Sequence, residues 1–370
     1  MIMALRRSSM ALRRGTVEWL KNSDESRVVT FVRRAGNEEV LVAINFSNQP
    51  FVGSVKVTDP SRFGAGLPAL SIDSWGYKIF EAHWPTAAKN GFGTSTTLTS
   101  KVWFTLANGV MTEVFYPTVD LPNVRTLQFQ VATGTKIENE IDDTVHRLEL
   151  PNPASLTFRQ INRAKSGAYT ITKTYITDPQ RSTVLIDVNF YTRTGAKLYV
   201  SYDPVDEGKS SALVSSCGFA NEATRRALKK NRCTLALGFG KTASEASATA
   251  QASLARGFEA ARVEYEAGWR SYVLQLPRIA KHQRQFNMSA MVLKGLEDKT
   301  YRGAVIASPS TPWGGSPSGY HAVWARDLYH VATAFDALGD RAAANRVLDY
   351  PSPRLWSPMQ GSKAGEAPSF

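Results

Sequence analysis

The sequence predicts a multidomain protein in which two β-rich blocks precede a helical block. Three observations support this fold class. Short alternating apolar runs separated by polar turns fill residues 1–82, and a longer series of such runs occupies residues 91–240. From residue 243 onward the apolar residues instead recur at spacings of three and four, which is the helical period. A chain of 370 residues with an apolar fraction of 43% has enough length and apolar content for two or three packed cores.

The first block is expected to be a small antiparallel β-sandwich. Turn-forming polar stretches such as NSDES and SNQP separate its apolar runs, and a short helix is expected at Met3–Arg14. The expected strands are Thr16–Leu20, Val28–Arg33, Val40–Asn45, Val52–Val57 and Gly76–Glu81.

The second block follows a linker expected at His83–Asn90 and is too large for one small sandwich. Two isolated acids in it, Glu113 and Asp120, are expected to be structural, and Asp203–Pro204 is expected to lie in a loop. The expected strands are Val102–Leu106, Thr112–Tyr116, Leu127–Val131, Tyr169–Ile176, Val184–Tyr191, Leu198–Tyr202 and Leu235–Phe239.

The helical block begins with one long amphipathic helix over residues 243–274, which Pro277 ends. A second helix is expected at Ile279–Leu296, with its aromatic and Met residues in the core. A third helix is expected from about Trp324, with Gly339 at its C-terminal end and Asp340 capping a following helix. Its apolar positions are Val323, Leu328, Val331, Ala332, Phe335 and Leu338.

Residues 301–319 have loop composition, with small residues, three Pro and four Gly. This loop delivers Trp324, Arg326 and Asp327 to a helix N-terminus. A carboxylate accepts hydrogen bonds from vicinal hydroxyls and a guanidinium donates to them, so this combination beside an aromatic ring indicates a sugar site. The alternative interpretation is a surface ion pair between Arg326 and Asp327, with Trp324 in the core.

Several other classes of function find little support in the composition. The formal net charge is +12, but the Lys and Arg residues are scattered and no nucleic-acid-binding module accompanies them, so we expect no nucleic-acid partner. No apolar run is long enough to span a membrane, and the basic N-terminus lacks the apolar core of a signal peptide. His282 and His321 lie near no Cys or acidic cluster with metal-ligand spacing, so we expect no metal site.

The two cysteines, Cys217 and Cys233, leave two possibilities open. They either pair across a hairpin or remain as two buried thiols.

Three stretches resemble known families. The segment ASPSTPWGG…GYHAVWARDLYHVATA resembles the start of the catalytic barrel in bacterial members of glycoside hydrolase family 15, the glucoamylases and glucodextranases. The stretch GFGTSTTLTSKVWFTLANGVMTEVFYPTVDLPNVRTLQFQV is similar to the opening of their N-terminal β-domain. The stretch ALRRGTVEWLKNSDESRVVTFVRRAGNEEVLVAINFSNQP resembles the C-terminal β-domain of family 13 α-glucosidases, which carries no catalytic residues.

These resemblances imply a domain organisation for the whole chain. They imply an amylase-type β-sandwich at residues 1–82, a β-supersandwich at 83–242 and a linker helix at 243–277. The first helices of a truncated (α/α)6 barrel would follow at 278–350. Residues 351–370, rich in Pro, Ser and Gly, are expected to be a disordered or aberrant tail.

The family 15 resemblance also implies an activity. Its members release β-glucose from the non-reducing ends of α-glucans by inverting hydrolysis without a cofactor, so the expected partner is a starch-type or dextran-type oligosaccharide. Both α-1,4 and α-1,6 linkages remain compatible with the sequence. By the same match, Arg326 and Asp327 would hydrogen-bond the 4- and 6-hydroxyls of the terminal glucose, and Trp324 and Trp313 would line the pocket. Family members are often secreted or periplasmic.

The residues for proton transfer are not matched. Glycoside hydrolysis needs two carboxyls that flank the scissile bond. In the family both are glutamates on loops farther along the barrel than this chain reaches, so we expect the chain to be truncated and inactive alone. Two alternatives are a non-catalytic carbohydrate-binding protein made of the β-domains and one half of a split enzyme.

Overall fold

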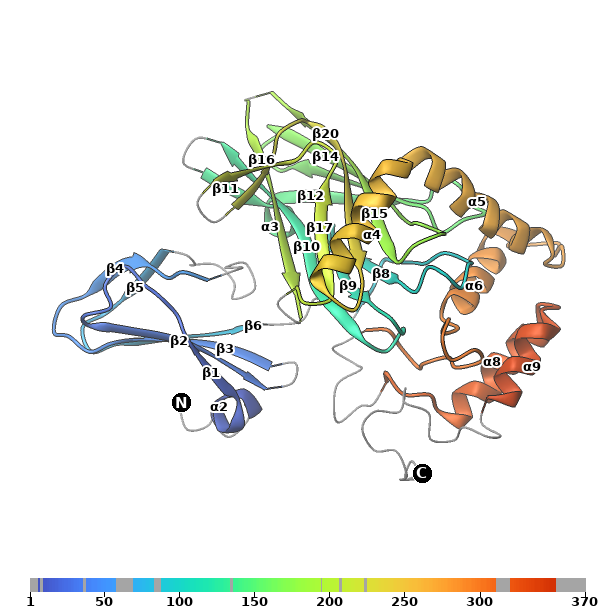
Figure 1. Ribbon diagram of the computed structural model, residues 1–370, viewed down its shortest axis with the longest axis horizontal. Helices are drawn as coiled ribbons and strands as arrows, with labels where there is room; N and C mark the ends of the chain where they lie inside the picture. The colour runs from blue at the N-terminus through green and yellow to red at the C-terminus, as the bar shows by residue number, and fades with distance from the viewer. Residues whose placement is uncertain are drawn as a thin grey trace. The chain divides into compact units, whose positions relative to one another are not determined.

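The computed structural model describes residues 6, 9–35, 38–57, 69–82, 88–133, 136–193, 195–205, 208–222, 225–310 and 320–350. The chain divides into two compact units, Met1–Trp84 and Pro85–Phe370. Figure 1 draws the first unit in blue and the second in cyan to red. The linker expected at His83–Asn90 falls at the division, although residues 83–87 lie outside the described part.

The first unit contains an antiparallel β-sandwich, as expected. One sheet has the order β1-β2-β3-β6, and β4 pairs with β5 in the other. Val32 and Leu41 from the first sheet share a buried cluster with Phe51 and Ile72 from the second, so a single core holds both sheets. The strands are β1 Thr16–Trp19, β2 Val28–Ala35, β3 Glu38–Asn45, β4 Phe51–Ser54, β5 Ala69–Ile72 and β6 Tyr77–Ala82.

Two details of this unit differ from the sequence-based expectation. Strand β5 was not predicted, because a Gly- and Pro-containing stretch directly precedes this short run. Within the described part of Met3–Arg14, helix α2 covers Met10–Arg14, and Ser9 Oγ caps it by accepting a hydrogen bond from the Leu12 amide (3.1 Å).

The second unit is built on two large antiparallel sheets. The eight-stranded sheet has the order β18-β19-β16-β10-β9-β8-β7, with β11 on β10, and the six-stranded sheet has the order β12-β13-β14-β15-β20-β17. Side chains from both sheets form one buried cluster, which includes Trp103, Phe129 and Tyr175. The strands are β7 Gly91–Gly93, β8 Trp103–Ala107, β9 Val110–Phe115, β10 Pro122–Thr133, β11 Lys136–Asn139, β12 Thr144–Glu149, β13 Phe158–Ala164, β14 Tyr169–Thr177, β15 Thr183–Thr192, β16 Lys197–Pro204, β17 Ser211–Ser215, β18 Phe219–Glu222, β19 Arg225–Leu228 and β20 Arg232–Phe239.

Every run predicted as a strand in this unit overlaps a strand, but several strands were missed. Strand β13 shows why: its core-facing side includes Gln160 and Asn162, which are 3% and 0% exposed, so polar residues interrupt the apolar alternation. The expectation of a loop at Asp203–Pro204 was wrong. Both residues lie in β16, where the Arg125 guanidinium pairs with the Asp203 carboxylate (3.2 Å).

The helix expected over residues 243–274 is two helices. Helix α4 spans Ala243–Arg256 and α5 spans Phe258–Leu274, and Gly257 separates them with a φ of +88°. Helix α4 packs on β17 and β20 (Figure 1). Gly238 allows this close approach, because a Cβ there would lie 2.4 Å from the Ala246 carbonyl oxygen. A short helix, α3 Glu140–Asp143, precedes β12.

In the described residues that follow, the helices are α6 Gln283–Gly295, α8 Ala325–Ala337 and α9 Arg341–Asp349. Helix α6 begins later than predicted, because His282 adopts a left-handed conformation with φ +60°. The expected pattern of α8 is confirmed, since its predicted apolar positions are buried or half-buried. Gly339 follows it with φ +78°, and Asp340 Oδ1 caps α9 through the Ala343 amide (3.0 Å). The tail expected at 351–370 lies outside the described residues.

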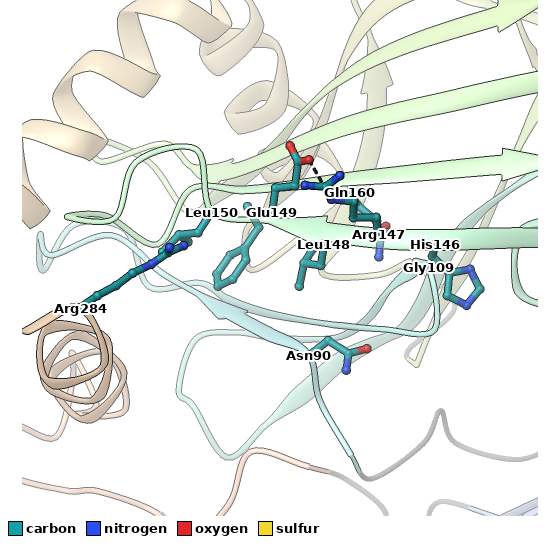
Figure 2. A pocket seen from close by; sticks show the side chains of 10 residues that line it. Asn90, Gly109, His146, Arg147, Leu148, Glu149, Leu150, Gln160 and Arg284 are labelled. Carbon is teal, nitrogen blue, oxygen red and sulfur yellow. Dashed lines mark ion pairs between the residues drawn. The ribbon is translucent and has the colours of Figure 1, made fainter. Parts of the chain in front are cut away.

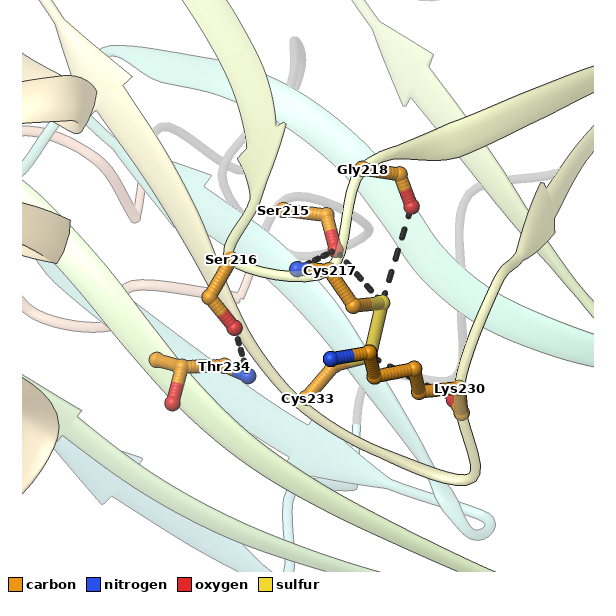
Figure 3. The surroundings of a disulfide bond; sticks show 7 residues. All are labelled: Ser215, Ser216, Cys217, Gly218, Lys230, Cys233 and Thr234. Carbon is orange, nitrogen blue, oxygen red and sulfur yellow. Dashed lines mark hydrogen bonds between the residues drawn. A yellow bond between two sulfur atoms is a disulfide. The ribbon is translucent and has the colours of Figure 1, made fainter.

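Cys217 and Cys233 form a disulfide, so pairing is the correct one of the two possibilities (Figure 3). The bond lies where β17 ends and β20 begins, next to the paired residues Ser215 and Leu235. Within the described residues, no helix has both the length and the apolar content needed to cross a membrane.

Candidate functional site

Three of the four predicted sugar-binding residues, Trp324, Arg326 and Asp327, lie at the N-terminus of α8. Trp324 is the N-cap residue, and its carbonyl oxygen accepts the first helical hydrogen bond from the Leu328 amide (2.9 Å). Arg326 and Asp327 occupy the first turn, where a carboxylate is favoured by the helix dipole. The sequence prediction for this helix boundary is therefore correct to within one residue.

Arg326 and Asp327 lie side by side and accessible. Their side chains are 74% and 34% exposed, and Arg326 Nε lies 3.8 Å from Asp327 Oδ1. This is the ion pair of the alternative interpretation, but Trp324 is half-buried and does not belong to the core. An exposed ion pair contributes only about 0–1 kcal/mol, so both groups can turn to a ligand at little cost. Trp313 lies outside the described residues.

The chain leading into α8 is fixed by backbone hydrogen bonds. The Ala307 amide donates to the Ala322 carbonyl (3.2 Å), and the Ser308 amide donates to the Tyr320 carbonyl (3.0 Å). Val323 and Leu328 are each 5% exposed and anchor both sides of the helix start. Backbone hydrogen bonds to residues 307 and 308 and the buried side chains of Val323 and Leu328 therefore both fix the position of the predicted site.

His321 packs against the end of strand β9 from the β-supersandwich. Its ring meets the Phe115 ring edge-on, with centroids 5.9 Å apart. Burial lowers the pKa of His321 to about 4, although a hydrogen bond with the Pro309 backbone opposes the shift. His321 is therefore neutral at pH 7, and its buried Nε2 has no hydrogen-bond partner among the described residues.

Three consecutive charged residues that the sequence analysis did not single out lie buried before this segment. Glu297, Asp298 and Lys299 are 5%, 0% and 8% exposed. In the sequence they stand between Leu296 and Thr300, and a run of three charges is typical of a solvated turn. No feature of spacing or composition indicated their burial.

Glu297 belongs to an ionic network with α9. Arg346 contacts its two carboxylate oxygens at 2.6 and 2.8 Å, and Arg302 Nε contacts it at 3.1 Å. Burial alone would raise the pKa of Glu297, but the Arg346 hydrogen bonds and the charges of Lys294, Arg346 and Arg302 outweigh it and lower the pKa to about 2. Lys294 links the network onward to Asp340 (2.9 Å).

Asp298 faces the β-supersandwich. Its Oδ2 accepts a hydrogen bond from the Val119 amide (3.0 Å), and its Oδ1 accepts from the Thr300 and Tyr301 amides (2.7 Å each). Burial raises its pKa, and these three backbone donors oppose the shift. Nearby Asp120 has its pKa raised to about 6 by burial and by the Asp298 charge.

Lys299 is buried against the loop that joins β7 and β8. Its Nζ donates to Thr94 Oγ1 (2.6 Å) and to the Ser100 carbonyl (2.5 Å), and it lies 5.0 Å from the centroid of the Trp103 ring. Burial lowers its pKa well below the ordinary value.

A separate cleft of about 520 Å³ lies elsewhere in the second unit (Figure 2). Strands β12 and β13 contribute Arg147, Glu149 and Gln160, and Arg284 reaches toward it from α6. Trp324, Arg326 and Asp327 do not line it, so it is separate from the part of the predicted site that the structure describes. Among the described residues, no three His, Cys, Asp or Glu side chains gather closely enough to hold a metal ion.

Comparison with known proteins identifies the family. The family model described as glucodextranase, domain N, matches residues 79–228 and 220–274, which together make up more than half of the chain. The chain belongs to this family. The model of glycosyl hydrolases family 15 matches residues 281–352, the part that carries α8 and the candidate site. The family 15 resemblance of the sequence is thereby confirmed.

Two relatives of this family 15 type show the same combination of parts. A glucoamylase from Clostridium sp. (strain G0005) is 33% identical over 339 residues, covering 73% of this chain and 48% of that protein. The crystal structure of a bacterial glucoamylase complexed with acarbose matches with a TM-score of 0.68 and 32% identity, over 74% of this chain and 51% of that chain. This chain thus spans about half the length of both relatives. The likeness confirms β-domains followed by the start of the helical barrel.

Proposed function

We propose that this chain serves α-glucan breakdown as a glucoamylase- or glucodextranase-type glycoside hydrolase, and that α8 carries its contact with the terminal glucose. The observation that supports this most is the accessible pair of Arg326 and Asp327 at the N-terminus of α8, inside the region matched by the family 15 model. A relative of similar fold was crystallised with the oligosaccharide acarbose, which fits an oligosaccharide ligand.

The chemistry of the pair suits a glucose ring. Asp327 offers two carboxylate oxygens that accept hydrogen bonds from hydroxyls, and Arg326 offers several donors in a planar fork. Together they contact the 4- and 6-hydroxyls of a non-reducing end, with the rings of Trp324 and Trp313 beside the sugar. The two side chains already lie close together, so little ordering is needed when a sugar binds.

The described acids near this helix do not supply the proton-transfer pair. Asp340 is engaged as the α9 cap and by Lys294, while Asp327 is assigned to the sugar. Inverting hydrolysis requires an acid that protonates the leaving oxygen and a base about 6.5–9.5 Å away that activates water. We therefore assign substrate recognition to these residues and leave both proton-transfer roles unassigned.

Binding of acarbose by the purified chain, measured by isothermal titration calorimetry, tests this proposal. We expect wild-type protein to bind and Asp327→Ala to lose at least about tenfold in affinity, because a hydrogen bond to a charged group contributes about 1.5–3 kcal/mol. Asp336→Ala, an exposed acid later on the same helix, is the matched control and should bind like wild type. Equal affinities for wild type and Asp327→Ala would contradict the proposal.

A second candidate is a non-catalytic carbohydrate-binding protein, favoured by the unassigned proton-transfer pair. Glucose release from maltotriose and isomaltotriose, followed by NMR of the released anomer, separates the two. Release of β-glucose supports the inverting hydrolase and identifies the linkage, whereas binding without release supports the binding protein.

A further inference from the structure

The three buried charges that precede the candidate site each contact a different part of the fold. Glu297 pairs with Arg346 of α9, Asp298 accepts a hydrogen bond from the loop between β9 and β10, and Lys299 donates to the segment between β7 and β8. Three consecutive side chains of one short turn thereby connect α9 to two loops of the eight-stranded sheet, the β7–β8 loop and the β9–β10 loop.

Burying three charged side chains in one turn carries a large desolvation cost. A buried charge must recover its lost hydration through hydrogen bonds, and apolar residues of similar size often stabilise a fold as well or better. Buried ionic groups can instead fix a register, because few geometries satisfy all of their hydrogen bonds. Here the hydrogen-bond partners include residues far away in the sequence: Lys299 and Thr94 are 205 residues apart.

The turn is directly continuous with the candidate site. Glu297 forms a bridge with Val305, and Val305 and Ile306 are 3% and 2% exposed. The next residues, Ala307 and Ser308, hydrogen-bond to Ala322 and Tyr320, just before α8. We define residues 305–308 and 320–327 as the sugar-binding segment.

The β-supersandwich meets this segment a second time. Phe115, at the end of β9, contacts His321 within the segment, and Val119, in the loop after β9, donates to Asp298. Phe115 and Val119 are both fully buried. The same β9–β10 connection therefore contacts the sugar-binding segment directly and also holds the turn that leads into it.

We propose that Glu297, Asp298 and Lys299 are positioning residues that align the sugar-binding segment on the β-supersandwich, with Asp298 as the link that sets sugar affinity. This rests on the proposed function, because it assumes that Arg326 and Asp327 contact the sugar. The β-supersandwich then acts in recognition without touching the ligand, by fixing where α8 begins.

The variant Asp298→Asn tests the link in the full chain. It keeps the size of the side chain but replaces one accepting carboxylate oxygen by an NH2 group, which donates and cannot accept, so one side of the contact loses its hydrogen bond. The expected result is an acarbose dissociation constant about tenfold higher, equivalent to about 1.4 kcal/mol. Asp336→Asn is the matched control. Lys299→Met, compared with exposed Lys281→Met, tests the second contact in the same way.

A double-mutant cycle separates positioning from general destabilisation. If Asp298 acts through Asp327, adding Asp298→Asn to Asp327→Ala costs much less affinity than it costs in wild type. A merely structural role would lower the melting temperature of Asp298→Asn and leave its dissociation constant within about twofold of wild type. That result, with binding still dependent on Asp327, would overturn the positioning role and spare the proposed function.

Hydrogen exchange of the amides at 320–328 tests the same point without ligand. We expect Asp298→Asn to speed exchange there and to leave α4 unchanged, because the segment loses a restraint that α4 does not share. Unchanged exchange at 320–328 would overturn the positioning role. Failure of the wild-type chain to bind acarbose would contradict the proposed function, and the exchange measurement does not depend on that result.

Discussion

Asp120 is a half-buried acid in the loop between β9 and β10. It was expected to be a structural acid, and one of its carboxylate oxygens is buried without a hydrogen-bond partner among the described residues. Burial and the nearby Asp298 raise its pKa to about 6 from 3.8. Between these values the folded protein holds a proton that the unfolded chain has released, so this group lowers stability as pH rises from about 4 to 6.

We therefore predict that Asp120→Asn stabilises the second unit at pH 7.5. The gain should approach roughly 2–3 kcal/mol, at about 1.4 kcal/mol per pKa unit, and should be nearly lost at about pH 3.5, where the carboxyl is protonated in the folded protein and mostly protonated in the unfolded chain. Melting temperatures at the two pH values measure it, with Asp336→Asn as control. Destabilisation at pH 7.5 would mean that the ionised carboxylate makes a favourable contact absent from this account.

The position of Trp324, Arg326 and Asp327 at a helix start could be predicted from the sequence, because apolar periodicity begins there directly after a stretch of loop composition. The sequence did not locate Glu297, Asp298 or Lys299, because the partners that hold these side chains include residues 49 positions away for Glu297 and about 200 positions away for Lys299. Burial of charge is a property of tertiary packing, and a single sequence carries no local mark of it.

At the scale of elements, strands and helices were predicted where apolar periodicity was uninterrupted. Strand β13 was missed because buried Gln160 and Asn162 replace apolar residues, and their partners Tyr175 and Glu140 lie on other elements. The break between α4 and α5 was missed because a single Gly inside a helical pattern is compatible with a continuous helix. Its φ of +88° becomes evident only in the structure.

Two glycines with similar φ angles provide a prediction that separates the cost of backbone strain from the cost of a steric clash. Gly257 and Gly303 have φ values of +88° and +91°, but a Cβ at Gly257 would meet nothing within 4 Å, whereas one at Gly303 would lie 2.0 Å from the Arg346 carbonyl oxygen. Gly257→Ala should cost about 1–3 kcal/mol from backbone strain alone, because its positive φ with extended ψ is a region that essentially only Gly adopts. Gly303→Ala should cost about 1–3 kcal/mol more from the clash with α9.

Chemical denaturation of both variants measures the difference. Equal costs would mean that α9 moves away from Gly303 freely, which would contradict the tight contact between α9 and the turn that carries Glu297.

The disulfide supplies a further prediction at this scale. It joins residues 16 apart in sequence, and closing a loop of about 15 residues stabilises a fold by about 3 kcal/mol. Reductant should therefore lower the melting temperature of the wild-type chain. A Cys217→Ser, Cys233→Ser double variant should melt at the reduced wild-type value and should not respond to reductant. Insensitivity of the wild type would indicate that the β17–β20 pairing alone holds this region.

At the scale of the whole molecule, the fold class was predictable because each block has its own period. The β-sandwich, the β-supersandwich and the helices are all present, and the family comparison agrees with the residues that carried the resemblance. The domain boundaries and the α-glucosidase-like origin of residues 1–82 remain predictions, although the division after Trp84 fits them.

We have proposed that Arg326 and Asp327 recognise the non-reducing glucose through its 4- and 6-hydroxyls. The most direct measurement compares the affinity of the full chain for maltose with that for the disaccharide in which galactose replaces the non-reducing glucose, so that only the 4-hydroxyl is inverted. We predict that wild type and Asp336→Ala prefer maltose clearly and that Asp327→Ala binds both sugars equally weakly. Equal affinities of the wild type for the two sugars, or a preference that survives Asp327→Ala, would contradict the account.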